Sequence, residues 1–502
     1  MKQLHSFPGP QEYIKLLKIR GADKQLSAFK RILEIAQAVK QAGGYALLVG
    51  GCVRDILLGM IPKDFDLEVY HLTPSRIESL IAKFGKVSEI GKAFSVYKVV
   101  FASGVGVEIS LPRRDSKSGA GHKGFKVAAD PHMSIKEAAR RRDFTINAIL
   151  LDPLTSTIYD TFGGIKDLKE SRLRVVDDKR FCDDPLRALR AIQFIARFKL
   201  QIDPKSADVI RKMLPHLKEL PAERILEEWK KLLLLAEEPS LGLQSGMELG
   251  VVPVLHPEFA PLPKTPQDPE WHPEGNVWTH TLICVDNGAK IIRREKLDER
   301  TAMRIMLSIL CHDLGKPKVT QVKNKKYVSP RHSIVGIEPT KSFLHTIGVD
   351  VRTNKKVLAL VRNHLAPVLL YNAEMIRKEK VTNSAIRRLA RRLYPATIYE
   401  LVLVAEADYF GKTIGKYTGE QNFPAGSWLL NRARMLDAAE RIPPDVIRGR
   451  DLLALGFEPG PHIGKIIKIA NQLRDEKGFN REEILNILLQ RAGKTLNTEH
   501  WG

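Results

Sequence analysis

The chain has 502 residues, of which 80 are Lys or Arg and 58 are Asp or Glu, so its formal net charge is +22. This excess of positive charge favours a polyanionic partner, and the absence of any apolar run near ~18 residues argues against membrane insertion. Four scattered cysteines without a C-x-x-C pattern, and no apolar signal segment at the N-terminus, lead us to expect a cytoplasmic protein.

The first 165 residues are expected to combine strands with helices. Residues 1–40 form a lead segment with an amphipathic helix near 26–40. The following part, 41–165, contains apolar or alternating runs that are typical of strands. The expected strands are 46–49, 65–70, 96–101, 105–111, 145–151 and 157–161.

A glycine pair follows the first expected strand. Gly50 and Gly51 permit a tight turn from residues 46–49 into a short helix that ends near Gly59. The N-terminus of such a helix presents backbone N–H groups and the positive end of the helix dipole. This turn is therefore suited to phosphate.

Three acidic residues alternate just beyond the glycine pair. On a strand, Asp64, Asp66 and Glu68 share one face. Two carboxylates at this spacing can hold Mg²⁺ ions that bridge to phosphate oxygens. The competing interpretation is a hairpin edge with solvated acids. The combination with the glycine turn favours phosphoryl-transfer chemistry.

Residues 134–149 place an arginine pair between a helix and a strand. Ser134 and Glu137 have the spacing of a capping box, which predicts the start of a helix. Arg142 can hold a triphosphate because its guanidinium group matches phosphate oxygens, and Asn147 can contact a ribose hydroxyl. A structural pair between Arg142 and Asp143 is the alternative.

Two further segments are strongly basic. Residues 113–124 form a glycine-rich loop whose arginines and lysines can contact a triphosphate or RNA. Residues 387–392 place four arginines on one face of an expected helix. A solvated loop and a solvated helix face are the alternatives.

A helix is expected to begin near Pro185, which suits the first helical position and places Asp184 at the N-cap. Arg187, Arg190 and Gln193 recur every three residues and share a face. Besides capping, a carboxylate beside a guanidinium can accept from an exocyclic amine and donate to the adjacent ring atom. Cytosine and adenine offer that edge, whereas uracil and guanine do not.

The rest of the chain reads as helical, except for a Pro-rich stretch at 256–275 that is expected to be a linker. Beyond it, histidines and aspartates follow the order H…HD…D. Imidazole and carboxylate groups in this order can hold a divalent metal that activates water. The expected ligands are His280, His312, Asp313 and Asp408, with His332 and His364 as possible additions.

At this point the sequence resembles the bacterial class II tRNA nucleotidyltransferases, the CCA-adding enzymes of the poly(A) polymerase-like family. The resemblance covers about residues 45–500. It rests on LVGGCVRD, KDFD, RRDFTINA and DDPLRALR in this order, and it continues through WHPEGNVWTH and the HD motif into the C-terminal half.

The resemblance implies an α+β fold with a mixed α/β nucleotidyltransferase head and an all-helical remainder that includes an HD phosphohydrolase domain. The expected divisions are a lead helix segment, the head, a helical neck and body, a linker, the HD domain and a helical tail. Their bounds are 1–40, 41–165, 166–255, 256–275, 276–420 and 421–502.

The resemblance also implies roles for individual residues of the head. Two catalytic Mg²⁺ ions are bound by Asp64 and Asp66, and Glu108 is a candidate third carboxylate. The residues expected to bind the incoming nucleotide are Gly51, Arg54, Arg142 and Arg190, with Asp184 and Arg187 reading its base.

Two positions depart from the family pattern. The family usually has Glu before the base-reading Asp, where this chain has Asp183. It often has a further Arg one helical turn after Arg190, where this chain has Gln193. The second departure leaves room for altered nucleotide choice.

We therefore predict template-independent addition of CCA to the 3′ end of tRNA from CTP and ATP, with Mg²⁺ in the head. A second activity, hydrolysis of 2′- or 2′,3′-cyclic phosphates with Ni²⁺, Mn²⁺ or Co²⁺, is expected in the HD domain. The alternatives are a poly(A) polymerase, a partial enzyme that adds only CC or A, and an HD phosphohydrolase whose head merely binds RNA.

Overall fold

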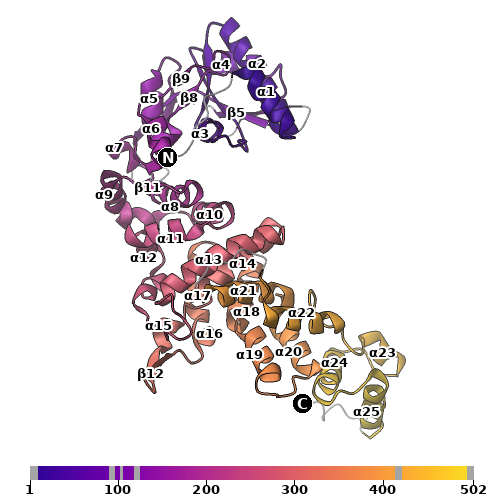
Figure 1. Ribbon diagram of the computed structural model, residues 1–502. Coiled ribbons are helices and arrows are strands. Elements are labelled where there is room, and N and C mark those ends of the chain that lie inside the picture. The colour runs from indigo at the N-terminus through magenta and orange to yellow at the C-terminus, as the bar shows by residue number, and fades with distance from the viewer. Residues whose placement is uncertain (1–8, 90–95, 102–105, 118–124, 413–420, 495–502) are drawn as a thin grey trace. The chain divides into compact units, whose positions relative to one another are not determined.

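The computed structural model describes residues 9–89, 96–101, 106–117, 125–412 and 421–494 (Figure 1). The chain forms two compact units. Unit 1 comprises residues 1–221 and 245–255, and unit 2 comprises residues 222–244 and 256–502. Unit 1 holds the mixed α/β head, whereas unit 2 is almost entirely helical, which confirms the predicted fold class.

The head is built on a seven-stranded sheet with the order β3-β4-β5-β2-β1-β8-β9. β2 and β5 pair in parallel, and the other neighbouring strands are antiparallel. The strands are β1 (Tyr45–Val49), β2 (Asp66–Tyr70), β3 (Lys86–Glu89), β4 (Val96–Val100), β5 (Gly106–Ser110), β8 (Leu150–Leu151) and β9 (Ile158–Tyr159).

Two expectations for the head differ from the structure. The segment expected as a strand at 145–151 begins as the 3-10 helix η1 (Thr145–Asn147), and only β8 is extended. The turn is held because the Thr145 hydroxyl donates to Asp167 and Asn147 is bonded on both sides of its amide. The basic loop begins as a hairpin of β6 (Arg113–Lys117) and β7 (Phe125–Ala129), while its residues 118–124 lie outside the described residues.

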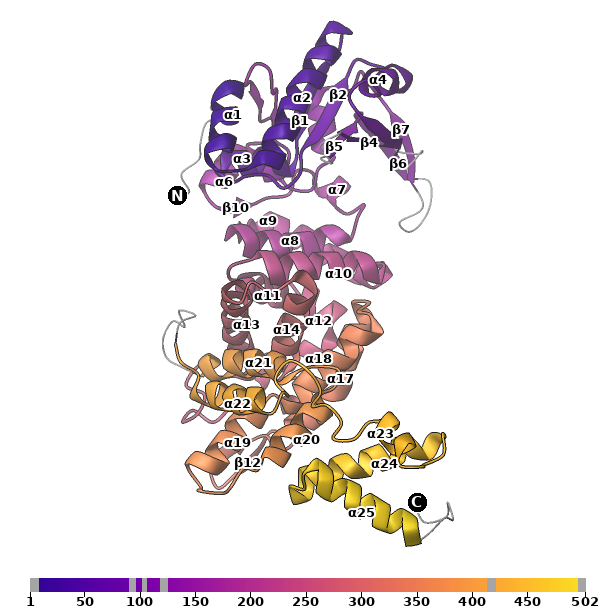
Figure 2. The same ribbon diagram turned by 90° about the vertical axis from the view of Figure 1, so that its right-hand side faces the viewer.

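Helix α2 (Asp23–Gln41) includes the predicted lead helix and packs beside β1, as Figure 2 shows. Its apolar side chains recur every three or four residues, which buries one continuous face. Helix α1 (Pro10–Ile19) packs against α2, and the rings of Tyr13 and Phe29 meet edge to face with centroids 4.9 Å apart. The lead segment is thus an integral layer of the head.

A buried hydrogen-bond chain connects α3 (Gly51–Leu57) with α8 (Leu186–Phe198). Arg54, only 4% exposed, donates through Nη1 to Asn147 Oδ1 at 2.6 Å, and Asn147 Nδ2 donates to Asp143 Oδ1 at 3.0 Å. Asp143 Oδ2 accepts from Arg190 Nε on α8 at 2.6 Å. The Arg54 guanidinium also lies over the ring of Phe198, 4.2 Å from its centroid.

Asp143 is the carboxylate in the middle of this chain. Burial alone would raise its pKa, but the Arg190 guanidinium and the Asn147 amide outweigh burial and lower the pKa to about 2. Asp143 therefore pairs with Arg190. The alternative pair of Arg142 with Asp143 is not observed.

Unit 2 is a helical assembly in which α13 packs against α14 and α21. Its helices include α10 (Ala222–Lys230), α13 (Val277–Arg294), α14 (Glu299–Cys311), α15 (Lys316–Val319), α16 (His332–Val335), α17 (Ile337–Thr346), α18 (Val351–Asn363), α19 (Ala366–Met375), α20 (Asn383–Leu393), α21 (Ile398–Gly411) and α22 (Pro424–Met435). None of the described helices combines the length and apolar character that crossing a membrane needs.

The Pro-rich stretch expected as a linker is folded within unit 2. It contains the 3-10 helices η4 (Pro257–Phe259) and η5 (Leu262–Lys264). Phe259 and Leu262 are each 1% exposed, because the proline-rich backbone still projects apolar side chains into the helical core. Its last residues reach the histidine cluster described below.

Figure 2 shows the C-terminal helices α23 (Gly449–Ala454), α24 (Pro461–Gln472) and α25 (Arg481–Lys494) next to one another. Their buried apolar side chains form a cluster of their own. In the predicted basic face of α20, Arg391 forms an ion pair with the buried Asp475, and Arg388 donates to the backbone carbonyl of the same residue. Part of this arginine cluster therefore holds the tail in place.

We predict that Asp143→Ala lowers the free energy of unfolding of unit 1 by about 3 kcal/mol, because it leaves Arg190 and Asn147 without their buried acceptor. Thermal or urea unfolding measures this loss. The matched control is Asp208→Ala, which removes an exposed ion pair with Arg211 and should cost less than about 1 kcal/mol.

The effect of Asp143→Ala should also depend on pH in a fixed direction. The folded pKa of about 2 lies below the ordinary 3.8, so the charged Asp143 stabilises the fold above about pH 4. This contribution is lost as the pH falls from about 4 toward 2. A stability difference that stays constant over this range would contradict the pairing.

Candidate active site and metal centre

The carboxylates of the head lie on neighbouring parallel strands. In the register of β2 and β5, Asp66 is paired directly with Glu108, so their side chains leave the sheet on the same face. Asp64 precedes β2 and lines a cavity of ≈ 670 Å³ together with Glu108, Lys63 and Lys98. The structure thus brings Asp64, Asp66 and the candidate third carboxylate, Glu108, together.

Electrostatics at this site favour a bound cation. Burial, with Glu108 and Asp64 nearby, raises the pKa of Asp66 to about 6, although Arg142 acts in the opposite direction. The donors are all carboxylate oxygens, the ligands that Mg²⁺ prefers. The residues present therefore fit a divalent ion of this kind.

Gly50 controls how closely Arg142 approaches the carboxylates. Its φ is +75°, and a Cβ added there would lie 2.9 Å from Arg142 Nη1 and 3.8 Å from Asp66 Oδ2. Arg142 is also held from behind, because its Nη2 donates to the buried Glu68 at 3.4 Å. Arg141 donates to the same carboxylate at 3.3 Å, so Glu68 orients an arginine pair instead of lining the cavity.

The predicted nucleotide-binding residues fall into two groups. Gly51 begins α3 and Arg142 lies partly exposed next to Asp66, at the edge of the carboxylate site. Arg54 and Arg190 belong to the buried hydrogen-bond chain that connects α3 with α8. These two arginines position the surrounding elements in this structure.

Asp184 and Arg187 lie at the start of α8. Asp184 Oδ1 accepts from the backbone N–H of Leu186 at 3.1 Å, so the carboxylate helps to begin the helix. Arg187 donates to the backbone carbonyls of Arg180 and Arg141 at 2.7 and 2.8 Å. The guanidinium is thereby fixed against the chain segment that carries Arg142.

Gln193, the departure from the family pattern, is 1% exposed and accepts from Arg197 at 3.1 Å. Its amide oxygen is therefore occupied by a hydrogen bond within α8. Arg190, one helical turn earlier on the same face of α8, is more accessible, with 31% of its side chain exposed to solvent.

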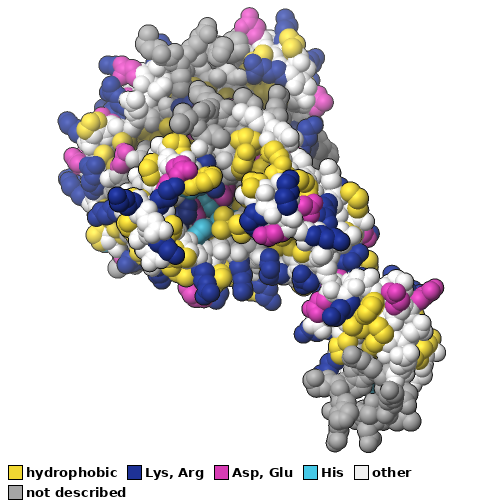
Figure 3. Space-filling view, turned by 60° about the horizontal axis from the view of Figure 1, so that its bottom comes forward, with side chains coloured by type: hydrophobic (Ala, Val, Ile, Leu, Met, Phe, Trp, Pro, Cys, Tyr) yellow, Lys and Arg dark blue, Asp and Glu magenta, His cyan; other side chains and the backbone are white. Residues whose placement is uncertain are grey.

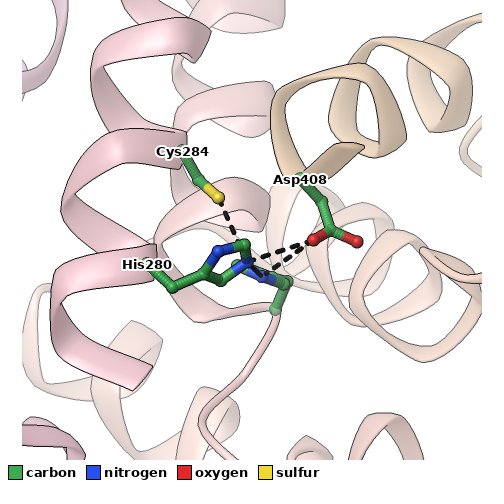
Figure 4. A group of neighbouring side chains, drawn as sticks. His280, Cys284 and Asp408 are labelled. Carbon is green, nitrogen blue, oxygen red and sulfur yellow. Dashed lines mark hydrogen bonds and ion pairs between the residues drawn. The ribbon is translucent and has the colours of Figure 1, made fainter. Parts of the chain in front are cut away.

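The second cluster occupies the core of unit 2. His280 on α13 and Asp408 on α21 approach to 3.1 Å between Nε2 and Oδ1, and His312 at the end of α14 places its Nε2 3.4 Å from that of His280. Figure 4 shows Cys284 and Asp408 on different sides of the His280 ring. Cys284 Sγ lies 3.3 Å from His280 Nε2, although no sequence pattern pointed to it.

A further group adjoins the first through Asp313. Its Oδ2 lies 3.2 Å from His312 Nε2, and its Oδ1 lies 3.3 Å from His332 Nε2. His332 Nε2 in turn lies 3.3 Å from His364 Nε2. All six predicted histidines and aspartates therefore converge, including the two that were considered only as possible additional ligands.

Backbone contacts fix the orientation of three of these histidine rings. In each ring, Nδ1 faces a carbonyl oxygen three residues earlier, at 2.7 or 2.8 Å, and must donate to it. Nε2 then carries the lone pair and points into the cluster, as metal ligands do. These rings are His312, His332 and His364. Burial lowers the pKa of His364 to about 3, which keeps it neutral.

His280 has a carboxylate behind it instead of a carbonyl. Glu274 Oε1 lies 2.7 Å from His280 Nδ1 and 2.8 Å from His272 Nδ1. A carboxylate–histidine pair of this type is common at metal sites, because it orients the ring and raises its basicity. Glu274 comes from the Pro-rich segment, and only its short spacing to His280 would have signalled it.

The cluster opens into a cavity of ≈ 280 Å³ whose lining includes Asp313, His332, His364 and Asp408. Figure 3 shows histidine side chains inside a hollow of the surface. Two lysines face the acids there: Lys316 Nζ lies 2.7 Å from Asp313 Oδ2, and Lys412 Nζ lies 3.6 Å from Asp408 Oδ1. Neither lysine was predicted from the sequence.

Three family models match this chain in succession. The poly A polymerase head domain matches residues 46–174, the probable RNA and SrmB-binding site of polymerase A matches 199–262, and the HD domain matches 277–411.

Among curated proteins, the chain is 33% identical over 395 residues to a multifunctional CCA protein of Xylella fastidiosa strain M12, with 76% of this chain and 87% of that protein covered. The chain belongs to the multifunctional CCA protein family. These are CCA-adding enzymes of the poly(A) polymerase family with an HD domain. A relative from Xanthomonas campestris strain B100 is 32% identical over 428 residues, covering 84% of this chain and 96% of the relative.

Solved structures show the same fold. A Thermotoga maritima CCA-adding enzyme complexed with tRNA has a TM-score of 0.57 at 19% identity, with 98% of this chain and 100% of that chain covered. A CCA-adding enzyme in complex with CTP has a TM-score of 0.60 at 18% identity, with 99% and 100% covered.

We predict that Gly50→Ala costs more activity than its backbone strain explains, because the added Cβ displaces Arg142 from Asp66. The matched control is Gly43→Ala. Gly43 has a similar φ of +88°, but a Cβ there would meet no atom within 4 Å. Both variants should lose about 1 kcal/mol of stability.

Only Gly50→Ala should slow nucleotide addition, by about tenfold or more. Stability is measured by urea unfolding, and addition by the rate at which radiolabelled CTP enters a truncated tRNA. Equal rates in the two variants would show that the space next to Gly50 has no part in nucleotide addition.

Proposed function

We propose that the head transfers CMP and AMP from CTP and ATP to the 3′ end of tRNA. The observation that carries this proposal is the register of β2 and β5, which pairs Asp66 with Glu108 next to Asp64. The 3′-hydroxyl of tRNA attacks the α-phosphate, and pyrophosphate leaves in line. Asp64 and Asp66 would hold two Mg²⁺ ions, which would supply positive charge for the attacking and leaving oxygens.

The remaining residues of the head position the nucleotide. Gly51 begins α3, whose backbone N–H groups face the phosphates, and Arg142 binds the triphosphate beside Asp66. Lys63 and Lys98 line the same cavity. Their positive charges stabilise the negative charge of the leaving pyrophosphate. Arg54 and Arg190 contribute indirectly. The hydrogen bonds that connect them through Asn147 and Asp143 fix the position of α3 relative to α8.

Asp184 and Arg187 select the base. The Asp184 carboxylate accepts from the exocyclic amine of cytosine or adenine, while Arg187 donates to the adjacent ring nitrogen. Arg187 is suited to this role because two backbone carbonyls fix its guanidinium group. The bond from Leu186 N–H to Asp184 Oδ1 places this carboxylate at the start of α8, close in sequence to Arg187.

The HD domain is proposed to hydrolyse 2′- and 2′,3′-cyclic phosphates with a transition metal such as Ni²⁺, Mn²⁺ or Co²⁺. The buried imidazole and carboxylate donors of His280, His312, Asp313 and Asp408 support this, because such mixed sets suit these metals better than Mg²⁺. Lys316 and Lys412, which line the cavity, favour an anionic substrate.

The partners proposed for this chain are tRNA, CTP and ATP. Similar CCA-adding enzymes were solved with CTP, with ATP and with tRNA. The excess of 22 positive charges in this chain suits binding of the acceptor arm through its phosphates.

We expect Asp184→Asn and Arg187→Ala to relax the preference for CTP and ATP over UTP and GTP by about tenfold or more, since a mispaired polar edge costs about 1–3 kcal/mol. Competition assays with pairs of nucleotides measure this ratio. Asp183→Asn makes the same chemical change one residue away and should keep the wild-type preference. If Asp184→Asn loses stability but keeps its selectivity, Asp184 serves only to begin α8.

The two activities should be separable. His312→Ala or Asp313→Ala should abolish hydrolysis of a 2′,3′-cyclic nucleotide in Co²⁺ or Ni²⁺ and leave CCA addition in Mg²⁺ nearly unchanged, because the two ligand sets lie in different units. Asp66→Ala should do the reverse. Each variant is assayed for both reactions.

Two surface variants serve as controls for this comparison. Glu78→Ala on the head and His345→Ala on α17 remove exposed side chains and should retain both activities. If the wild-type protein hydrolyses none of these phosphates with any of the metals, the phosphohydrolase proposal fails. Loss of both reactions in His312→Ala would contradict separate sites.

A further inference from the structure

The lead helix α2 reaches the carboxylate site of the head. Its first turn contributes Lys24 and Gln25 to the cavity of ≈ 670 Å³ that Asp64 and Glu108 also line. The helix lies outside residues 46–174, which the poly A polymerase head domain matches. One wall of this cavity therefore comes from a segment to which no motif in the sequence assigned a function.

Aromatic packing fixes this end of α2 next to the acids. Phe29 is completely buried, and its ring centroid lies 6.0 Å from that of Phe65, the residue between Asp64 and Asp66. Gln25 precedes Phe29 by one helical turn and shares its face. Because α2 also contacts β5, this face is held toward the cavity.

Lys98 reaches the same cavity from the sheet. It is paired with Glu108 in the register of β4 and β5, and Glu108 is paired with Asp66 in that of β5 and β2, so the three side chains leave one face of the sheet in a row. Gly106 leaves room for the lysine, because a Cβ added there would lie 3.1 Å from Lys98 Cε. The Lys98 side chain therefore lies across β5, next to Glu108.

Three lysines of this cavity have no acidic partner. Within the described part of the chain, Lys24, Lys63 and Lys98 form no ion pair, although Asp64 and Glu108 line the same cavity. If the acids hold Mg²⁺ as proposed above, their charge is neutralised and the lysine charges remain. Such a cavity attracts an anion with several charges more strongly than one with a single charge. Pyrophosphate carries several, whereas a phosphodiester of RNA carries one.

We propose that Lys24 and Gln25 of the lead helix bind the leaving pyrophosphate, together with Lys63 and Lys98. The Lys24 ammonium group and the Gln25 amide donate to oxygens of the β- and γ-phosphates, which leave as pyrophosphate. The inference rests on the proposed nucleotide transfer and deepens it, because it adds binding residues from α2 to that site.

Direct binding of pyrophosphate tests the proposal without catalysis. Isothermal titration calorimetry measures the affinity of the full chain for magnesium pyrophosphate. Lys24→Ala should weaken this affinity about tenfold, the usual scale for a lost hydrogen bond to a charged group, and Lys24→Arg should retain most of it. Asp66→Ala should also weaken binding, which would locate the anion in the head.

A matched control lies on the same helix. Lys30→Ala removes an exposed lysine of α2 that does not line the cavity, and it should bind pyrophosphate as the wild type does. Urea unfolding measures the stability of each variant, which should be unchanged because Lys24 and Lys30 are exposed.

Steady-state kinetics distinguish pyrophosphate from RNA as the occupant of this wall. On a tRNA that ends before CCA, Lys24→Ala should raise the KM for CTP about tenfold and leave the KM for tRNA unchanged. Gln25→Ala should raise the KM for CTP less, because it removes a neutral donor.

Two results would overturn the proposal. One is equal affinity of Lys24→Ala and wild type for magnesium pyrophosphate. The other is a raised KM for tRNA with an unchanged KM for CTP, which would assign this wall to RNA. If the wild type extends tRNA but binds pyrophosphate without Lys24, nucleotide transfer stands and this inference fails. If it extends no tRNA but binds pyrophosphate through Lys24, the proposed function fails and the pyrophosphate site stands.

Discussion

The buried guanidinium group of Arg54 is the constraint on which the head depends. A charge that is 4% exposed is stable only if its environment is polar and fully paired, and Asp55, Asn147 and the ring of Phe198 provide this. Since Asn147 is bonded to Asp143, and Asp143 to Arg190, satisfying Arg54 also fixes the glycine turn relative to α8. The glycine turn beside the carboxylate site and the helix that we propose to read the base are thereby held together.

The core of unit 2 contains a cluster of buried polar and charged side chains. Its core collects imidazole nitrogens and carboxylates where a protein normally places apolar side chains, and the backbone carbonyls turn the nitrogen lone pairs inward. Packing of these polar groups contributes little to the stability of the fold, and their arrangement is the one expected of a cation-binding site. Glu274 and the two lysines complete it from the Pro-rich segment, α15 and the end of α21.

Local patterns in the sequence predicted much of the head and the histidines and aspartates that converge in the HD domain. The glycine pair, the alternating acids and the capping residues act within a few positions, so spacing alone reveals them. Contacts between distant residues were not predictable in this way. Glu68 accepts hydrogen bonds from Arg141 and Arg142 and orients both side chains. Asp143 pairs with Arg190 on α8 and not with the adjacent Arg142. The 3-10 turn at 145–147 was missed because side-chain bonds to Asp167, Arg54 and Asp143 override its strand-like composition.

The most direct test of the account uses a tRNA transcript that ends just before CCA. With Mg²⁺, CTP and ATP, the product should be longer by three nucleotides, with CTP alone by two, and with UTP or GTP it should not grow. Gel resolution of single nucleotides decides this. A ladder of many added A residues, or a halt at two or one nucleotides with both substrates present, would contradict the assignment of Asp64, Asp66, Asp184 and Arg187 to complete CCA addition.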